Sequence, residues 1–268
     1  RTRFVIGNSF FKRNWVQAPA STKVRDGLGP HFISRSCGGC HVLDGRGQPP
    51  EFKKGLVDHD PPTEMLIRLS VPGTPHPHDG VVPEPTYGDQ FNNAAVEGVK
   101  PEGDVVIRHT PVHGRFADGT RYTLQQPHYG FKNLGYGPMA ANVMLSPRVA
   151  PQLMGIGLIE AIPEAEVQAN AKTQATMAGP IKGVAARVWD APSQQMMLGR
   201  FGWKAGAATI AHQSAGAFRG DIGITSPWAP EEACTSAQAD CLAAPRGGHG
   251  DEHEIDLKTL EDVVFYQA

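Results

Sequence analysis

The sequence lacks a strong excess of either charge and lacks a long apolar run. Its 25 lysines and arginines nearly balance 27 aspartates and glutamates, which gives a formal net charge of −2 over 268 residues. A nucleic-acid-binding surface carries a basic excess, so we expect no nucleic-acid partner. The longest uncharged apolar stretch, residues 149–159, is too short to cross a bilayer. We therefore expect no membrane span.

The beginning of the chain lacks both an initiator methionine and an apolar signal segment. It reads Arg1-Thr2-Arg3-Phe4, so we expect a processed or shortened chain. The length is sufficient to bury a substantial core, in one large domain or two small ones. The 31 glycines and 23 prolines favour long loops between regular elements.

Cysteine is scarce, with four residues in the chain. Two of them stand in the sequence Cys37-Gly38-Gly39-Cys40-His41, and the others are Cys234 and Cys241. A disulfide between Cys234 and Cys241 would close a short loop and contribute roughly 2–3 kcal/mol of stability in the chain-entropy model. The alternative is a pair of unrelated free thiols.

The C-x-x-C-H pattern at residues 37–41 is the attachment sequence for c-type haem. Two thiols three positions apart lie on one side of a helical turn, where each can form a thioether to a vinyl group of the same porphyrin. His41 then presents its imidazole nitrogen to the iron. The alternatives are a redox dithiol, which needs a βαβ context, and half of a zinc site, which needs a second pair of ligands. We therefore expect one covalent haem c, held by Cys37 and Cys40 and ligated by His41.

A disulfide in the same chain as a covalent haem indicates an oxidising compartment. The simplest such compartment is a bacterial periplasm, so we expect a protein that has been secreted across the inner membrane.

The ligand on the haem face opposite His41 decides the chemistry. A methionine or a second histidine there gives an electron carrier, whereas an open face with polar groups gives a site where peroxide or another oxidant can bind. Residue type alone does not select a ligand among seven methionines and 11 histidines. The candidates that we consider, and for which packing or a solvated loop is the more ordinary explanation, are Met139, Met144, Met154, the pair His109 and His113, and residues 249–253.

The middle of the chain predicts β-structure. Residues 65–71 form a short apolar run that ends at Pro72-Gly73 and is typical of a buried strand. Residues 105–109 and 121–124 also predict strands, and the Asp118-Gly119 pair between them predicts a hairpin turn. We expect a β-rich insertion over about residues 65–145.

Helix signals return in the second half. Pro163 suits a first helical position, Glu164 complements the helix dipole, and Gly179-Pro180 marks a stop. Asp256 can cap a helix over the last dozen residues. Cytochrome c folds close by crossing such a helix over the one that precedes the haem motif. The expected fold is therefore mainly α with β additions: one cytochrome c-like helical haem domain over residues 1–268, with long loops and a hairpin insertion.

Several blocks of sequence resemble a known family. They are residues 29–32, 36–41, 44–50, 146–153, 155–163, 199–205 and 220–226. The first two blocks are similar to the first haem motif of bacterial di-haem peroxidases. The remaining blocks resemble one branch of that superfamily, the di-haem oxidoreductases often labelled thiol oxidoreductases. The resemblance covers nearly the whole chain, and the combination of blocks is what makes it specific.

The resemblance implies roles for individual residues. Residues 201–204 correspond to a block of the di-haem peroxidases that lies near the haem, so Phe201 and Trp203 are expected to contribute to cofactor binding. Arg148, in the block of residues 146–153, is expected to contribute as well. Gln213 matches a distal-pocket glutamine, and Asp221 falls near a distal glutamate. Catalytic roles are thus implied for Gln213, Asp221 and Trp203, with the carboxylate moving a peroxide proton and the amide orienting the O–O bond. Two departures are that aspartate replaces glutamate and that the spacing is slightly shorter.

A second C-x-x-C-H motif, normal in this family, does not occur in the sequence. Either a second haem is expected in a missing domain or in a partner chain, or the chain is a mono-haem version of the family. The first hypothesis is a haem-c oxidoreductase domain of di-haem peroxidase type, with a partner cytochrome or second haem domain and with a homo- or hetero-oligomer left open. The alternatives are a non-catalytic electron-transfer cytochrome with a methionine or histidine as sixth ligand, and a structural haem subunit that docks through the hairpin.

Overall fold

The computed structural model describes residues 1–50, 64–247 and 253–268. Within them lie seven α-helices and nine strands, and the chain is 26% helical and 24% strand. The prediction of a mainly α fold is therefore wrong, because the fold is mixed α and β. The reason lies in the middle of the chain, where each of the two hairpin strands has 12 residues, against 13 in the longest helix. The histidine at position 249 lies outside the described residues.

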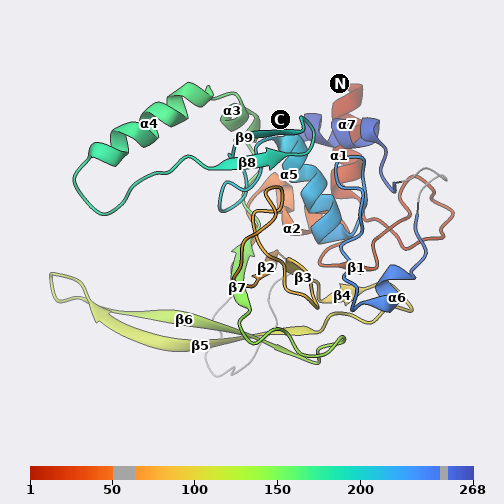
Figure 1. Ribbon diagram of the computed structural model, residues 1–268, viewed down its shortest axis with the longest axis horizontal. Coiled ribbons are helices and arrows are strands. Elements are labelled where there is room, and N and C mark those ends of the chain that lie inside the picture. Colours follow the sequence, from red (N-terminus) through yellow and green to blue (C-terminus); the bar gives the residue numbers. More distant parts are fainter. Residues whose placement is uncertain (51–63, 248–252) are drawn as a thin grey trace.

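The two ends of the chain pack against each other, as Figure 1 shows for α1 (Thr2–Lys12) and α7 (Leu257–Gln267). The helices approach so closely at Gly7 that a Cβ atom there would overlap the carbonyl oxygen of Asp262. Asp256 caps α7 by accepting a 2.8 Å hydrogen bond from the backbone N–H of Thr259. The predicted closing helix is confirmed.

The haem motif forms a short turn against α1. Cys37–Cys40 is a single helical turn, α2, followed by the 3-10 turn η1 (Val42–Asp44). A Cβ atom on Gly39 would overlap the hydroxyl of Ser34, so this position needs glycine for close packing. The residues before the motif are extended and include β1 (His31–Phe32), which pairs with β4 (Ala94–Ala95).

A three-stranded antiparallel sheet supports one wall of the site. Its order is β3 (Gln90–Phe91), β2 (Met65–Ser70), β7 (Met144–Val149). Burial alternates along β2, with Met65, Ile67 and Leu69 in a hydrophobic core. The predicted strand at residues 65–71 is confirmed, and its period of two directs Arg68 to the opposite face.

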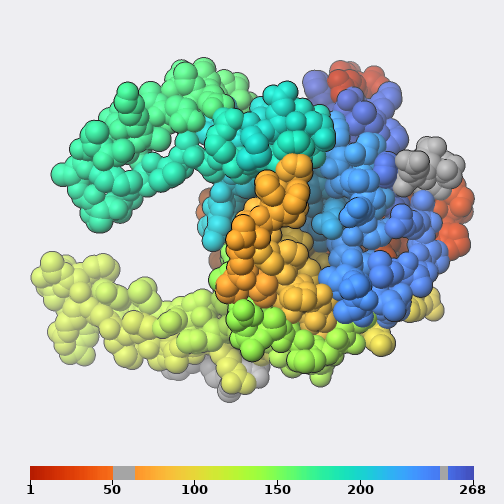
Figure 2. All heavy atoms as spheres, viewed as in Figure 1, coloured from red at the N-terminus to blue at the C-terminus, as the bar shows by residue number. Residues whose placement is uncertain are grey.

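Two arms project from the same side of the molecule (Figures 1 and 2). One is the hairpin of β5 (Asp104–Arg115) and β6 (Arg121–Lys132), which confirms the predicted turn, since Gly119 has φ 88°. The other carries α4 (Glu164–Thr176), which begins one residue after the predicted first position, Pro163, ends three residues before Gly179 and buries none of its residues. It follows α3 (Ile156–Glu160).

The remaining elements close the fold around the haem turn. Strands β8 (Arg187–Asp190) and β9 (Gln195–Leu198) form a hairpin, and α5 (Ile210–Ala217) runs into the π-helical turn η2 (Phe218–Ile222). The short helix α6 (Ala239–Leu242) carries Cys241, which forms a disulfide with Cys234. No helix in the described part of the chain has the length and apolar character that a membrane span requires.

Candidate haem-binding site

A cavity of about 680 Å³ lies between the haem turn, the β2–β7 ladder and α5. This volume falls in the range of small-molecule and cofactor sites, roughly 300–1,000 Å³. All eight residues that the sequence suggested for the haem site line it: Cys37, Cys40, His41, Arg148, Phe201, Trp203, Gln213 and Asp221. Residues more than 180 positions apart in the chain are thus brought to one site.

The two motif cysteines are half-buried, and neither forms a disulfide in the described part of the chain. Burial raises the pKa of both Cys37 and Cys40 to about 12, and the Asp221 carboxylate adds to the rise. Both sulfur atoms therefore carry protons at neutral pH. No group of three or more His, Cys, Asp or Glu residues in the described ranges could hold a metal ion by itself.

His41 presents a neutral imidazole at the edge of the same cavity. Burial lowers the pKa of its ring, and the backbone carbonyls of Pro151 and Gly45 partly offset this. Its Nδ1 atom is buried and makes no hydrogen bond within the described residues. The ring of Phe11 packs 6.3 Å away between centroids. A neutral imidazole is the form that donates a nitrogen lone pair to a metal.

Asp221 lies in η2 and is tied to the segment that precedes the haem turn. Its backbone carbonyl accepts hydrogen bonds from the N–H groups of Ile33 (2.9 Å) and Ser34 (3.1 Å). Its Oδ1 accepts a 2.9 Å hydrogen bond from Nε2 of Gln90. Burial raises the pKa of Asp221, and the charge of Arg68 partly offsets the rise. Single π-helical turns of this kind are frequent at functional sites.

Gln213 and the turn of residues 201–204 form another part of the cavity wall. Gln213 stands on α5, whose first turn is capped by Thr209, the hydroxyl of which accepts a 3.0 Å bond from the N–H of His212. Phe201 is buried, whereas Trp203 is 63% exposed and donates a 2.7 Å hydrogen bond from Nε1 to the carbonyl of Val149. Trp203 therefore lies at the rim of the cavity.

Several residues of the site were not found from the sequence. Gln90, Arg68, Asp89, His78 and Trp189 carry no motif. The rings of His78 and Trp189 stack with 3.8 Å between their centroids, so the segment before residue 82 lies against β8. Figure 2 shows the same contact between the orange and the teal segments of the chain. One signal was available: Arg68 is the one charged residue in the apolar run of residues 65–71.

The methionines and histidines considered as sixth ligands differ in whether they line the cavity. Among the described residues, no methionine lines the cavity; Met139 packs against the core behind β2, and Met144 and Met154 are exposed. His109 and His113 stand on the hairpin strand β5 and do not line the cavity either. The histidines that line it besides His41 are His78 and His212.

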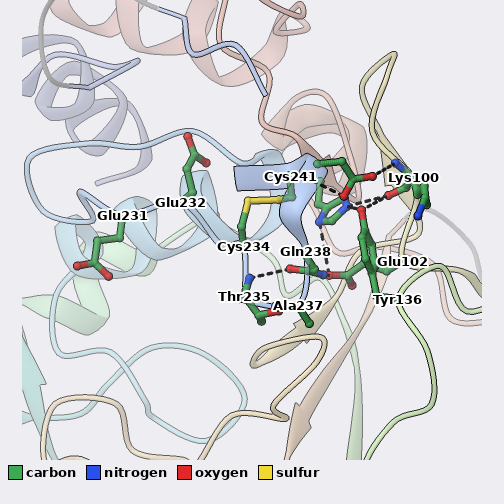
Figure 3. Close-up of a disulfide and its surroundings, with 12 residues drawn as sticks. Lys100, Glu102, Tyr136, Glu231, Glu232, Cys234, Thr235, Ala237, Gln238 and Cys241 are labelled. Atoms are coloured by element: carbon green, nitrogen blue, oxygen red, sulfur yellow. Dashed lines mark hydrogen bonds and ion pairs between the residues drawn. A yellow bond between two sulfur atoms is a disulfide. The ribbon is translucent and has the colours of Figure 1, made fainter. Parts of the chain in front are cut away.

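A polar network that includes Glu102 and Gln238 lies beside the disulfide (Figure 3) and extends to His31 on β1. Nε2 of His31 lies 2.8 Å from the carbonyl of Lys100, and its Nδ1 lies 3.6 Å from Glu102. Glu102 accepts hydrogen bonds from Nε2 of Gln238 (2.6 Å) and from the N–H of Asn92 (2.5 Å). Because Gln238 lies inside the disulfide loop, the disulfide holds the network that supports the segment before the C-x-x-C-H motif.

Comparison with known proteins gives one match. The family described as "Di-haem oxidoreductase, putative peroxidase" matches residues 2–268, which is essentially the whole chain. No curated protein and no solved structure matches the chain.

Proposed function

The chain belongs to the di-haem oxidoreductase family, and on this premise we propose that it is a c-type haem oxidoreductase of the di-haem peroxidase type. Residues 1–268 form one haem domain, with one haem c held by thioethers to Cys37 and Cys40 and ligated by His41. The observation that carries the proposal is the shared cavity, in which the attachment motif meets the polar residues Gln213 and Asp221.

The residues of the cavity fit a covalent haem. The volume of the cavity suits a cofactor, both thiols are protonated and outside any disulfide of the described residues, and the His41 imidazole is neutral. A bound haem c supplies the redox-active iron. The protein contributes the two covalent anchors, a nitrogen ligand and the walls that exclude water.

Asp221 is the proposed proton carrier. Because Oδ1 accepts the hydrogen bond from Gln90, the other carboxyl oxygen is left to hold a proton, and burial favours the protonated form. In its ionised form this carboxyl can take a proton from one oxygen of a peroxide, and the protonated carboxyl that results can return it to the other oxygen. The amide of Gln213 orients the peroxide, and Trp203 at the rim is placed to relay electrons.

A second candidate is a non-catalytic electron carrier. It needs a sixth ligand, and the described cavity wall offers His78 and His212 but no methionine. Nδ1 of His212 lies 3.6 Å from Oδ1 of Asp190. Burial lowers the pKa of the His212 ring, so a neutral imidazole is available. This candidate therefore takes a histidine as its sixth ligand.

The proposed partner is a redox cytochrome or a second haem domain. The family is described as di-haem, whereas this sequence has one attachment motif, so the second haem belongs to another domain or chain. The Cys234–Cys241 disulfide supports an oxidising compartment, and we propose the periplasm.

The test is spectroscopy of the holoprotein from a host that attaches haem c. Carbon monoxide is added to the reduced form and hydrogen peroxide to the oxidised form, with absorption and EPR spectra recorded. An open sixth position predicts a carbon monoxide complex and a reaction with peroxide. A low-spin haem that binds neither ligand in either state would favour the electron carrier.

A further inference from the structure

Two arginines lie side by side on the cavity face of the β2–β7 ladder. In the register of the two strands Leu66 pairs with Arg148, and Arg68 pairs with Ser146. Arg68 and Arg148 are therefore diagonal neighbours on one face of the sheet, because side chains alternate along each strand. Both line the cavity that holds the haem motif.

The positive charge of the two arginines exceeds the negative charge of the carboxylates beside them. Arg68 forms a 2.5 Å ion pair with Asp89 through a terminal guanidinium nitrogen, and its Nε atom is buried without a hydrogen-bond partner. Arg148 donates from Nε to the hydroxyl of Ser146 at 3.3 Å and forms no ion pair within the described residues. The Asp89 carboxylate thus faces two guanidinium groups, and the other carboxyl near Arg68 is that of Asp221, whose protonated form burial favours. Burial and the like charge of Arg68 both lower the pKa of Arg148, and Asp89 only partly offsets this.

The other cations of the cavity wall are engaged or exposed. Arg187 pairs with Glu164 at 2.8 Å. Arg219 donates to the backbone carbonyls of residues 231 and 232. Lys204 is exposed to solvent at the rim. Arg148 is therefore the half-buried cation whose charge the described chain leaves without an ion pair.

A partly buried cation without a counter-ion is costly, and a guanidinium fork matches a carboxylate with two parallel hydrogen bonds. We propose that Arg148, assisted by Arg68, binds a propionate carboxylate of the haem. This inference rests on the proposed function. A haem held by two thioethers at its vinyl edge brings two carboxylates at its other edge, and this chain provides an unpaired cation in the same cavity.

The experiment measures the reduction potential of the holoprotein against pH, after its mass has shown a covalent haem. Without its cation, the propionate pKa rises, so reduction is coupled to protonation at higher pH. Arg148→Gln should therefore lower the potential at about pH 8 and steepen its dependence on pH below that. Arg68→Gln should change the curve in the same direction. Arg121→Gln, on the exposed hairpin, is the charge-matched control and should leave it unchanged.

An Arg148→Gln curve that overlays those of the wild type and the control overturns the proposal. If the Arg148→Gln protein does not acquire its covalent haem, Arg148→Lys is tested in its place. This substitution keeps the positive charge but loses the guanidinium fork. It should shift the propionate bending band in resonance Raman spectra, and an unshifted band overturns the proposal.

A second arm separates the haem carboxylate from a soluble one. Sodium acetate is added to the wild-type holoprotein at constant ionic strength. If a propionate occupies the arginines, acetate should leave the potential unchanged. A saturable shift that Arg148→Gln abolishes would assign the pair to a soluble anion and overturn the proposal. If the wild-type protein carries no covalent haem, the proposed function itself is wrong.

Discussion

The Tyr266 hydroxyl donates a 2.7 Å hydrogen bond to the Asp44 carboxylate, which joins the last turn of α7 to the residue three positions after His41. The ammonium group of Lys12, at the end of α1, lies 3.3 Å from the same carboxylate. One aspartate therefore connects both terminal helices to the haem turn. The closing helix consequently does more than cover the core, because it also holds the turn that follows His41, the proposed haem ligand.

Replacing Tyr266 with phenylalanine should weaken this connection. The ring would still pack against Phe11, at 5.4 Å between centroids, while Asp44 would lose a donor. We expect the free energy of unfolding to fall by about 1 kcal/mol, the usual net value of such a bond. Urea unfolding of the holoprotein measures it. Tyr122→Phe, on the projecting hairpin, should change it by less than about 0.5 kcal/mol, and equal effects of the two substitutions would contradict the account.

Local signals in the sequence predicted the elements whose formation is local. The alternating strand at residues 65–71, the Asp118-Gly119 hairpin and the Asp256 cap are each specified by a few neighbouring residues. Helix α1 was not predicted, because Gly7 interrupts its interior and its apolar residues do not form a stripe. Its stability comes from packing on α7, which no local pattern reveals.

The prediction of a mainly α fold was wrong for a related reason. The haem motif and the closing helix indicated a helical domain, whereas the sheet and hairpin of the middle section contribute nearly as much structure. The site residues that came from family resemblance do meet in one cavity. Gln90 and Asp89 could not have been found, because they lie in and directly before a two-residue strand, which carries no periodicity of its own.

The disulfide loop should contribute measurable stability. Cys234 and Cys241 are seven positions apart, and a loop of this size contributes roughly 2–3 kcal/mol in the chain-entropy model. The double variant Cys234→Ser/Cys241→Ser should lose about this amount in urea unfolding. A phosphine reductant should lower the stability of the wild type toward that of the variant and leave the variant unchanged. A variant as stable as the oxidised wild type would show that the loop is held by other contacts.

Glu102 should make stability depend on pH. Burial raises the pKa of its carboxyl from 4.5 to about 8. The folded state therefore binds the proton more tightly than the unfolded state, and the free energy of unfolding should fall as the pH rises through this window. Glu102→Gln removes this titration, so its stability should change less between about pH 5 and 8. Urea unfolding at several pH values measures both slopes, and parallel slopes would contradict the assignment.

Asp221 should control the reaction with peroxide. Asp221→Asn keeps an oxygen that can accept from Gln90 but cannot carry a proton, so the rate should fall by about a hundredfold or more. Stopped-flow absorption of the oxidised holoprotein measures this rate, and carbon monoxide binding to the reduced form should be unchanged. Glu166→Gln, on the exposed helix α4, is the matched control and should react like the wild type. An Asp221→Asn variant with the wild-type rate would remove Asp221 from the proposed mechanism.

The most direct test of the central claim is the intact mass of the purified chain under denaturing conditions, after expression with a haem c maturation system. The account predicts the mass of the polypeptide plus one haem, and the loss of that haem in the double variant Cys37→Ser/Cys40→Ser but not in Cys234→Ser/Cys241→Ser. A wild-type chain that has the polypeptide mass alone, or that keeps its haem without Cys37 and Cys40, would contradict the account.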